Sequence, residues 1–328
     1  MSVLVTGGAG YIGSHAVRRL RAAGASVAVV DNLGLGHRAA VPADVPFFQV
    51  DLRQTDALRD VLTSQRIDCV MHFAALAQVG ESVAEPLRYY SNNVGGTLSL
   101  LEAMQSTGVR RIVFSSTCAV IGIPDKLPIV ETLPREPINP YGRSKLVIEQ
   151  VLQDWSQADP QFAAVALRYF NVAGCASDGS LGEDHNPETH LIPILLQVAL
   201  GKRPHVTLFG KDYPTADGTC IRDYVHVDDL CDAHVLALKA IRPGMAVYNV
   251  GIGRGYSVQE VLAAARVVTG HPIPAQFGPR RPGDPPALFA NAAKITAELA
   301  WQPKFTNLEE VIETAWRWFQ AHPSGYEA

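Results

Sequence analysis

The chain has 328 residues, 47% of them hydrophobic and 18% charged, and a net charge of −4. This is the composition of a globular enzyme, and the acidic balance argues against nucleic acid or an anionic membrane as the main partner, since those surfaces recruit basic proteins. The five scattered cysteines include no C-x-x-C pair, so they indicate neither a zinc site nor a disulfide framework. We expect no bound metal.

The N-terminal stretch "SVLVTGG" has the pattern of a strand rather than of a signal peptide. No apolar run approaches the ~20 residues that are needed to span a bilayer. Together with the unpaired cysteines, this predicts a cytoplasmic protein without a membrane partner.

In the first half of the chain, apolar runs typical of strands alternate with helical patterns. The predicted strands are 2–6, 26–30, 45–50, 68–74, 110–116 and 162–170. The predicted helices are 12–23, 54–65, 84–107 and 141–157. Continuous apolar strands that alternate with helices predict an α/β fold with a doubly wound parallel sheet, the Rossmann arrangement, over residues 1–170.

Beyond residue 170 the regularity falls and Gly, Pro and Asp become more frequent. Loops with special backbone demands separate shorter predicted helices, at 190–200, 227–241, 257–269 and 307–320. Residues 171–328 are therefore expected to form a second, smaller α/β domain that closes over the first and binds the substrate.

The motif "VTGGAGYIGSH" follows the first predicted strand and opens a helix. Its Gly7, Gly10 and Gly13 allow the backbone to turn tightly and approach a pyrophosphate, while Tyr11 and Ile12 begin a helix whose N–H groups favour an anion. Strand before and helix after are the context in which such a glycine pattern indicates dinucleotide binding.

The ends of the next strands complete the expected cofactor site. Asp31 ends the second strand, where it would accept hydrogen bonds from a ribose diol and repel a 2′-phosphate, so NAD is favoured over NADP. Asp51 and Leu52 follow the third strand and would frame the adenine. "HFAA" at 72–75 ends the fourth strand with Phe73, Ala74 and Ala75.

"INPYGRSKLVIEQV" places Tyr141 and Lys145 four residues apart at the start of a predicted helix. Asn139 suits the N-cap, and Pro140 suits the first helical position. Residues i and i+4 share a helix face, so the phenol and the ammonium can act on one small volume. A purely structural interpretation is also possible, with a packed tyrosine and a solvated lysine, because Y-x-x-x-K is common by chance.

With these pieces assembled, the chain resembles the extended short-chain dehydrogenase/reductase family over essentially its whole length, and within it the 4-epimerases of UDP-glucose and UDP-galactose. The motifs that carry the resemblance are "TGGAGYIGSH", "DNLGLG", "HFAALAQVGES", "YYSNNVGGTL", "FSSTCAVIG", "NPYGRSK", "LRYFNVAG", "DYPTADGTCIRDYVHVDDL", "YNVGIGRGYSV" and "RRPGDPPA".

The resemblance implies that Thr117, Tyr141 and Lys145 are the catalytic residues. Tyr141 would take the proton of the sugar 4-hydroxyl while bound NAD takes a hydride from C4, and the 4-ketose would turn over and receive the hydride on its other face. Lowering a tyrosine pKa from near 10 to about 7 needs roughly 4 kcal/mol. Lys145 and the positive nicotinamide ring are expected to supply it.

The resemblance also implies contacts to both ligands. The cofactor set is Gly7, Gly10, Tyr11, Ile12, Gly13, Asp31, Asn32, Asp51, Leu52, Phe73, Ala74, Ala75, Asn92, Ser115, Tyr141, Lys145 and Phe170. The UDP-sugar set is Thr117, Asn171, His190, Leu191, Phe209, Arg222, Arg281, Asp284 and Leu288. In it, the two arginines clamp the diphosphate, Asp284 takes a ribose hydroxyl and His190 contacts the uridine phosphate. His185 and His226 are interpreted as structural.

Three positions depart from or tune the family pattern. Ile121 precedes Gly122 where relatives have an aromatic residue, and Ala77 stands where many carry a lysine after the fourth strand. Leu288 occupies a position that gauges pocket size in the family. Because leucine is intermediate in size, the glucose/galactose pair is the expected main substrate, with tolerance for N-acetylated sugars left open.

Other functions remain open at this stage. A UDP-arabinose/UDP-xylose 4-epimerase or a UDP-N-acetylglucosamine 4-epimerase shares these motifs. A 4,6-dehydratase or decarboxylase needs an acid beside the threonine, where this chain has Cys118 and Ala119. A non-catalytic NAD-binding protein would typically lose the tyrosine or the lysine. A homodimer is expected through 84–107 and 141–157, to which Leu98, Leu101, Leu146 and Leu152 contribute or instead face the sheet.

Overall fold

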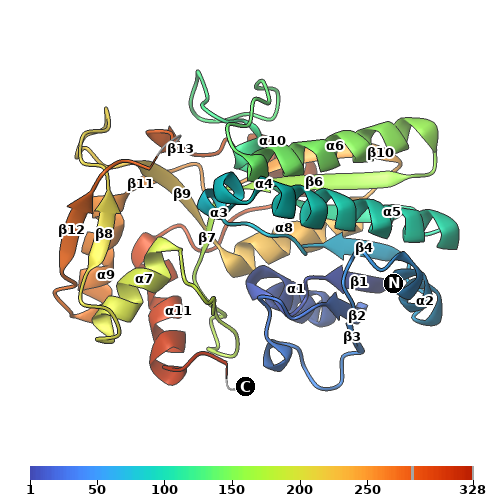
Figure 1. Ribbon diagram of the computed structural model, residues 1–328, viewed down its shortest axis with the longest axis horizontal. Coiled ribbons are helices and arrows are strands. Elements are labelled where there is room, and N and C mark those ends of the chain that lie inside the picture. Colours follow the sequence, from blue (N-terminus) through green and yellow to red (C-terminus); the bar gives the residue numbers. More distant parts are fainter. Residues whose placement is uncertain (282–283, 327–328) are drawn as a thin grey trace.

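The computed structural model describes residues 1–281 and 284–326 and consists of a large layered α/β part and a smaller part beside it (Figure 1). The large part is built on a seven-stranded, all-parallel sheet in the order β10-β6-β5-β4-β1-β2-β3. Its strands are β1 (Ser2–Thr6), β2 (Ser26–Asp31), β3 (Phe47–Gln49), β4 (Cys69–His72), β5 (Arg111–Thr117), β6 (Ala163–Tyr169) and β10 (Gly244–Val250).

Helices cover both faces of this sheet, which confirms the doubly wound fold predicted from the alternation of strands and helices. On one face, α1 (Tyr11–Ala22) and α8 (Val227–Ala240) pack in a core that includes Val3 and Val5 of β1. On the other face, α2 (Thr55–Ser64), α5 (Gly96–Thr107) and α6 (Pro140–Ala158) pack around Leu4. Alternate residues of one strand thus serve opposite cores, as the pleat requires.

The sheet also recruits elements from beyond residue 170. β10 pairs in register with β6, and α8 packs against α1. The sequence pattern predicts a helix at 227–241 but no strand at 244–250, and residues 171–328 are predicted to form the second domain. The large layer is therefore not contiguous in sequence.

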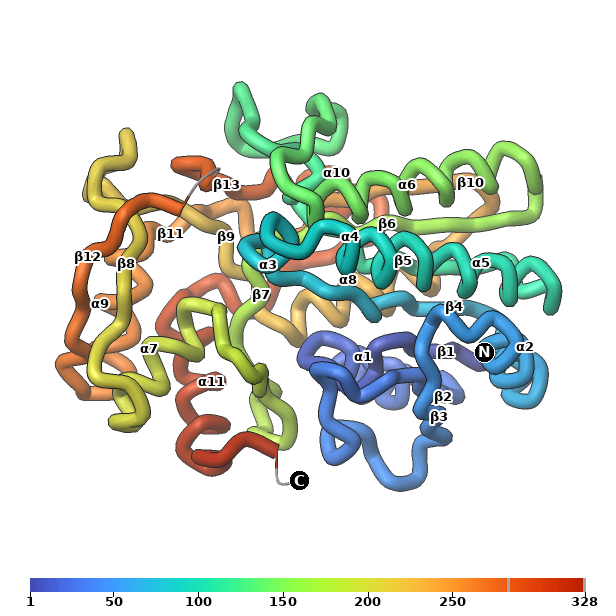
Figure 2. Tube along the Cα trace, in the orientation of Figure 1, coloured from blue at the N-terminus to red at the C-terminus, as the bar shows by residue number. Residues whose placement is uncertain are grey.

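The predicted helix at 84–107 is interrupted. Its segment contains α4 (Pro86–Tyr89), a π-helical stretch (Tyr90–Gly95) and α5, and α3 (Val79–Ala84) precedes them. Pro86 disfavours a helical conformation at Glu85, which has φ −126° and ψ 59°, so the helix restarts at the proline. Figure 2 shows these segments running together along one side of α6.

The smaller part contains a four-stranded sheet and a two-stranded one. In the first, β9 (Ile221–His226) pairs with β7 (Asn171–Ala173), β11 (Gly255–Ser257) and β13 (Ala287–Leu288); in the second, β8 (Val206–Phe209) pairs with β12 (Ala275–Gly278). Its helices are α7 (Leu191–Ala199), α9 (Val258–Thr269) and α11 (Leu308–Ala321), whereas α10 (Ala293–Leu299) packs against α8 and β10 of the large part. Short 3₁₀ turns lie at Arg38–Ala40 and Cys118–Val120.

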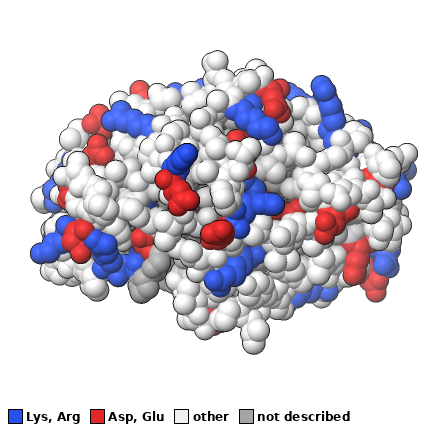
Figure 3. All heavy atoms as spheres, turned by 90° about the horizontal axis from the view of Figure 1, so that it is seen from above, with Lys and Arg blue, Asp and Glu red and all other residues white. Residues whose placement is uncertain are grey.

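The distribution of charge on the surface and the state of the cysteines are consistent with the composition. Figure 3 shows basic and acidic side chains interspersed over one face of the molecule rather than gathered by sign. In the described part of the chain, no helix combines the length and apolarity needed to cross a bilayer. All five cysteines carry free thiols, and all but Cys118 are fully buried.

Candidate active site

The glycine-rich turn between β1 and α1 is shaped so that only glycine fits at two positions. Gly7 has φ +73°, and a Cβ built on it would lie 2.6 Å from the backbone nitrogen of Ala74. A Cβ on Gly13 would lie 2.0 Å from the carbonyl oxygen of Gly7. Gly10 is the N-cap of α1 and has no side chain to occupy the N–H groups of the first turn. These features fit a dinucleotide pyrophosphate at the start of α1.

We expect Gly13→Ala to abolish cofactor retention. The added methyl overlaps a backbone atom, so the turn must open, and overpacking of this kind costs about 1–3 kcal/mol. The measurement is the NAD content of the purified, denatured protein by absorbance and enzymatic cycling. Gly80→Ala is the matched control, since a Cβ there meets no atom within 4 Å. Equal NAD in Gly13→Ala and wild type would refute the assignment of this turn.

Asp31 joins this turn to the end of β2. Its carboxylate accepts hydrogen bonds from the backbone N–H groups of Ala9, at 3.0 Å, and Leu33, at 2.8 Å. Burial raises the pKa of Asp31, and the two N–H bonds oppose that rise. The structure thus gives Asp31 a role that the sequence did not show, that of holding the glycine-rich loop, and its contact to a ribose stays a prediction.

The other residues predicted for the adenosine side lie at neighbouring strand ends. Asn32 donates to the Asp51 carboxylate at 3.2 Å. Arg53 forms two further hydrogen bonds to Asp51 and holds the pKa of that carboxyl well below its usual range. Leu52 packs close to Gly96, where an added Cβ would come within 3.1 Å of it.

The end of β4 lies beside the glycine-rich turn. Ala74 contacts Gly7, and the ring of Phe73 packs 4.7 Å from that of His234 on α8. Ala75 follows as a half-buried residue, and Ala77 is exposed. Asn92 lies in the π-helical stretch and donates to the side chain of Asn93 at 3.0 Å. The C-terminal ends of β4, β1 and β2, which are neighbours in the sheet, therefore lie together where a cofactor would cross the sheet.

Tyr141 and Lys145 stand on the first turns of α6, as predicted. The Asn139 side chain caps this helix by accepting the N–H of Gly142 at 2.8 Å, and Pro140 is its first residue. Both side chains are buried, with 7% and 3% of their surfaces exposed. Lys145 is therefore not a solvated surface lysine, as a purely structural interpretation would have it.

Burial acts on the pKa of both members of the pair. The ammonium of Lys145 donates to the backbone carbonyl of Ser115 at 2.9 Å and lies 4.8 Å from the centre of the Phe114 ring. Burial lowers the pKa of Lys145 to about 7, against the opposing charge of Glu149. Burial likewise raises the pKa of Tyr141, while a polar contact with Thr117 lowers it. The protein groups alone thus do not bring the pKa of Tyr141 near neutral pH.

Two buried residues that the sequence analysis did not single out, Glu149 and Arg168, support this pair. Glu149, one turn beyond Lys145, is fully buried and receives two hydrogen bonds from Arg168 of β6, at 2.8 and 2.6 Å, and one from Ser116, at 2.7 Å. The network ties α6 to β5 and β6. A charged residue on the apolar side of α6 and another inside an apolar strand were the available signals.

A second supporting contact comes from the π-helical stretch. The side-chain amide of Asn93 is fully buried, accepts the N–H of Leu76 at 2.8 Å and donates to the Leu76 carbonyl and to Ser144. It therefore holds the loop after β4 against α6, next to Tyr141. Nearby, Ser115 donates to the hydroxyl of Tyr169 at 2.9 Å.

The residues predicted for the UDP end gather around β9. Arg222 is buried and forms an ion pair with Asp284, and the guanidinium of Arg281 lies 4.2 Å above the ring of Phe209. Leu288 of β13 stands in register with Arg222. Pro282 and Gly283 of the "RRPGDPPA" motif lie outside the described residues.

An apolar cluster joins the two groups of candidate residues. Ile121 and Phe170 are buried in it, and Cys118 and Leu288 pack against it. Cys118 directly follows Thr117 and is close enough to Arg222 for that charge to act on its thiol. The end of β5 and the start of β9 therefore meet at one place. Ile121, where the family pattern led us to expect an aromatic residue, is part of this cluster.

The remaining predicted substrate residues lie on β7 and at the start of α7. Asn171 begins β7 and pairs with Tyr224 of β9. His190 is the N-cap residue of α7, Leu191 is its first residue, and His190 forms an ion pair with Glu183.

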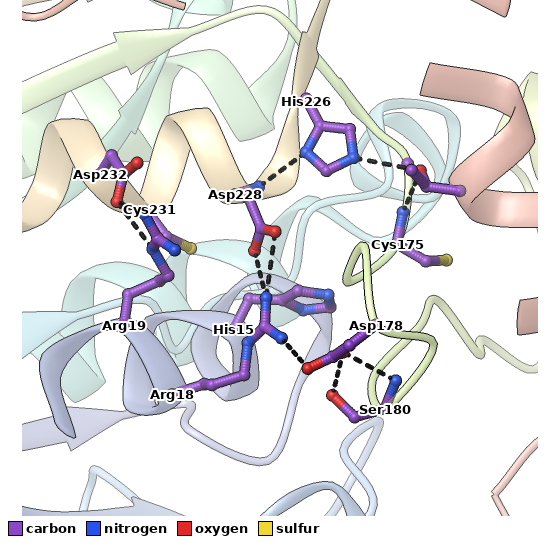
Figure 4. A network of polar contacts seen from close by, with 12 residues as sticks. His15, Arg18, Arg19, Cys175, Asp178, Ser180, His226, Asp228, Cys231 and Asp232 are labelled. Carbon is purple, nitrogen blue, oxygen red and sulfur yellow. Dashed lines mark hydrogen bonds and ion pairs between the residues drawn. The ribbon is translucent and has the colours of Figure 1, made fainter. Parts of the chain in front are cut away.

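Polar contacts hold the first helix against the smaller part (Figure 4). Arg18 of α1 bonds to Asp228 of α8 and to Asp178 in the loop after β7. His226, at the start of α8, accepts the N–H of Asp228 at 3.1 Å and bonds to Thr314 of α11. Burial lowers the pKa of His226 to about 4, which agrees with the structural role expected for it.

This geometry is that of an α/β enzyme with a dinucleotide-type glycine-rich turn, a buried tyrosine–lysine pair and a second region that carries two arginines. The model of the NAD dependent epimerase/dehydratase family matches residues 3–251, and the chain belongs to that family. NAD is accordingly its cofactor.

The relatives that match over nearly the whole chain are named as UDP-sugar 4-epimerases. The chain is 52% identical over 329 residues to a UDP-glucose 4-epimerase of Lactobacillus helveticus, covering 100% of this chain and 99% of the relative. A solved structure of UDP-glucose 4-epimerase from Bifidobacterium longum in complex with NAD+ and UDP has a TM-score of 0.96 and 42% identity, over 99% of this chain and 100% of that one. A probable UDP-arabinose 4-epimerase of Oryza sativa subsp. japonica is 46% identical over 99% of this chain and 83% of its own length.

Proposed function

We propose that this chain interconverts UDP-galactose and UDP-glucose, with NAD as a resident cofactor that is not consumed. The observation that carries the proposal is the buried Tyr141–Lys145 pair on α6, set beside Thr117 and the strand ends that fit a dinucleotide. Identity near one half with UDP-glucose 4-epimerases over the full length supports the same reaction.

In the proposed mechanism, Tyr141 holds the proton of the sugar 4-hydroxyl and returns it to the 4-ketone from the same position. Thr117, at the end of β5, hydrogen-bonds that oxygen and polarises the ketone. When bound, oxidised NAD would accept the hydride from C4 of the sugar and would add a positive charge to the site. Burial raises the pKa of Tyr141, so the base depends on the positive charges brought near it, including the protonated fraction of Lys145.

The UDP end is proposed to bind at β9. Arg222 and Arg281 offer planar forks that match diphosphate oxygens, and Asp284 and Phe209 lie beside them. Arg222 is already paired with Asp284, so substrate oxygens would share the guanidinium with this carboxylate. Asn171, Leu191 and His190 are proposed to contact the diphosphate and uridine, with Leu288 beside the sugar.

A 4-epimerase acting on a UDP-pentose is the second candidate, and the 46% identical rice relative favours keeping it. The experiment is turnover of UDP-galactose, UDP-arabinose and UDP-N-acetylgalactosamine by purified protein without added NAD, followed by chromatography of the products. We expect UDP-galactose to react fastest. Faster conversion of the pentose would assign the second function, and no turnover with NAD supplied would leave a protein that only binds.

We further propose that residues 1–170 carry the cofactor and 171–328 the nucleotide sugar, although α8 and β10 belong to the large layer. A reduced, cytoplasmic setting is supported by the five free thiols.

A homodimer through the helices next to α6 is also part of the proposal. Apolar side chains that are exposed on α3, α4 and α5 support it: Val83 is 64% exposed, Leu87 82% and Leu98 41%. Leu101 and Leu152 instead face the sheet core, and Leu146 packs against the apolar cluster near Ile121.

We expect the double substitution Leu87→Asp and Leu98→Glu to convert the dimer to a monomer, because two charges would be buried unpaired in the interface. Sedimentation velocity measures the change. Val267→Asp is the control, since this residue is 71% exposed but lies on the distant α9. Wild type that sediments as a monomer, or a variant that remains dimeric, would contradict this interface.

A further inference from the structure

The loop between β7 and α7 contains a compact set of ligating side chains, of which the proposed reaction uses only His190. Glu183, His185, Glu188 and His190 each offer one oxygen or nitrogen atom, and these four atoms all lie within 4.8 Å of one another. They come from the single stretch "EDHNPETH". Two imidazoles and two carboxylates are a ligand set that zinc takes in proteins.

The distances within the set match those around one small cation. Metal–ligand bonds of 2.0–2.2 Å in a tetrahedron place neighbouring ligand atoms about 3.4 Å apart. The Nδ1 atom of His185 lies 3.3 Å from Glu183 and 3.6 Å from Glu188, and the Nδ1 atom of His190 lies 3.9 Å from Glu188. His190 contacts Glu183 more closely than this tetrahedral separation, and the His185 and His190 distances are to different oxygens of Glu188. The four ligand atoms are thus already gathered, and to bind one ion His190 and Glu183 would move apart while the wider pairs would move inward.

The burial and charge of the two carboxylates call for a cation. Their side chains are only 3% and 2% exposed, for Glu183 and Glu188. In the described part of the chain, neither pairs with a lysine or arginine. Two buried anions that face only imidazoles need either two added protons or a divalent ion, because unpaired buried charge is strongly unfavourable. Backbone N–H groups of Thr189 and His190 orient Glu188, as is usual for a metal-binding carboxylate.

The surroundings give such an ion a place in the fold. The ring of His185 meets the ring of Tyr11 on α1 edge-on at 6.3 Å, and the Tyr11 hydroxyl donates to the carbonyl of Gly174. Asp184, inside the motif, accepts the N–H of Tyr326 at 2.9 Å near the C-terminus. The loop thus touches the first helix, the last described residues and the start of α7.

From this geometry we propose that Glu183, His185, Glu188 and His190 bind one structural divalent transition-metal ion, zinc by ligand type, which fixes the loop between β7 and α7. All four positions of a tetrahedron are filled by the protein, so the ion closes the loop rather than activating a water molecule. His190 would bind it through Nδ1, and its proposed substrate contact then has to come from Nε2.

The test is the metal content of untagged protein that retains its NAD, purified without chelators and measured by plasma mass spectrometry. We expect about one zinc per chain in wild type, and less than about a tenth in His185→Gln, which keeps the side chain polar but removes the imidazole ligand. His271→Gln is the matched control, an exposed histidine outside the cluster. It should keep the wild-type zinc content.

A second measurement does not depend on any variant folding. Chelator treatment of wild type should lower Tm, and added zinc should restore it in proportion to the logarithm of its concentration. The proposal is overturned if wild type contains no metal and takes up none on titration with zinc chloride, which would leave an ion-pair cluster. Equal zinc in His185→Gln and wild type would also overturn it.

Discussion

Replacing Tyr141 by Phe is expected to lower turnover of UDP-galactose by about 10²–10⁴-fold, the range associated with a positioned general acid or base. The substitution removes one oxygen from a buried ring and leaves the apolar packing of that ring in place. KM should change little, because the hydroxyl acts mainly on the transition state. The measurement is kcat with a coupled UDP-glucose dehydrogenase assay.

Two controls separate chemistry from folding in this experiment. NAD content of Tyr141→Phe should match wild type, which shows that the cofactor site is intact. Tyr256→Phe removes a hydroxyl that donates to the Thr306 carbonyl in the smaller part, and it should retain near-normal turnover. If Tyr141→Phe kept more than about a tenth of wild-type kcat, Tyr141 would not be the base.

The second large effect is expected at Arg168. Arg168→Met leaves the fully buried Glu149 carboxylate without its bidentate partner, and breaking a buried pair in this way costs about 3–5 kcal/mol of unfolding free energy. Arg135 lies 3.6 Å from the same carboxylate, but its side chain is 44% exposed and cannot replace both bonds. Urea denaturation at pH 7 with saturating NAD measures the change.

The double variant Arg168→Met with Glu149→Leu should recover most of this loss, because no charge then remains buried. Arg110→Met provides the comparison for an exposed pair, since Arg110 bonds to Asp159 at the surface, and it should leave the urea midpoint nearly unchanged. A loss in Arg168→Met that the double variant does not relieve would mean that packing, and not the ion pair, governs this position.

The sequence by itself determined the features that depend on neighbours along the chain. Alternating apolar runs predicted the strands and helices of the first half to within a few residues, except for the helix at 84–107, which the structure interrupts. Gly7 and Gly13 predicted a turn that admits no side chain, and in the structure a Cβ on either residue would overlap backbone atoms. Asn139 and Pro140 marked the start of α6, and the spacing of Tyr141 and Lys145 then followed from helix geometry.

Only the tertiary structure decided what those residues face. Lys145 donates to the Ser115 carbonyl and burial lowers its pKa to about 7, and the nearby Glu149–Arg168 pair joins residues 19 positions apart. β10 reaches the large sheet from residue 244 onward, and Leu101 and Leu98 of one helix separate into core and surface. "EDHNPETH" showed no ligand spacing of a familiar kind until the loop brought its four side chains together. Local patterns report backbone preference, whereas burial and charge state are set by partners distant in sequence, which no short window contains.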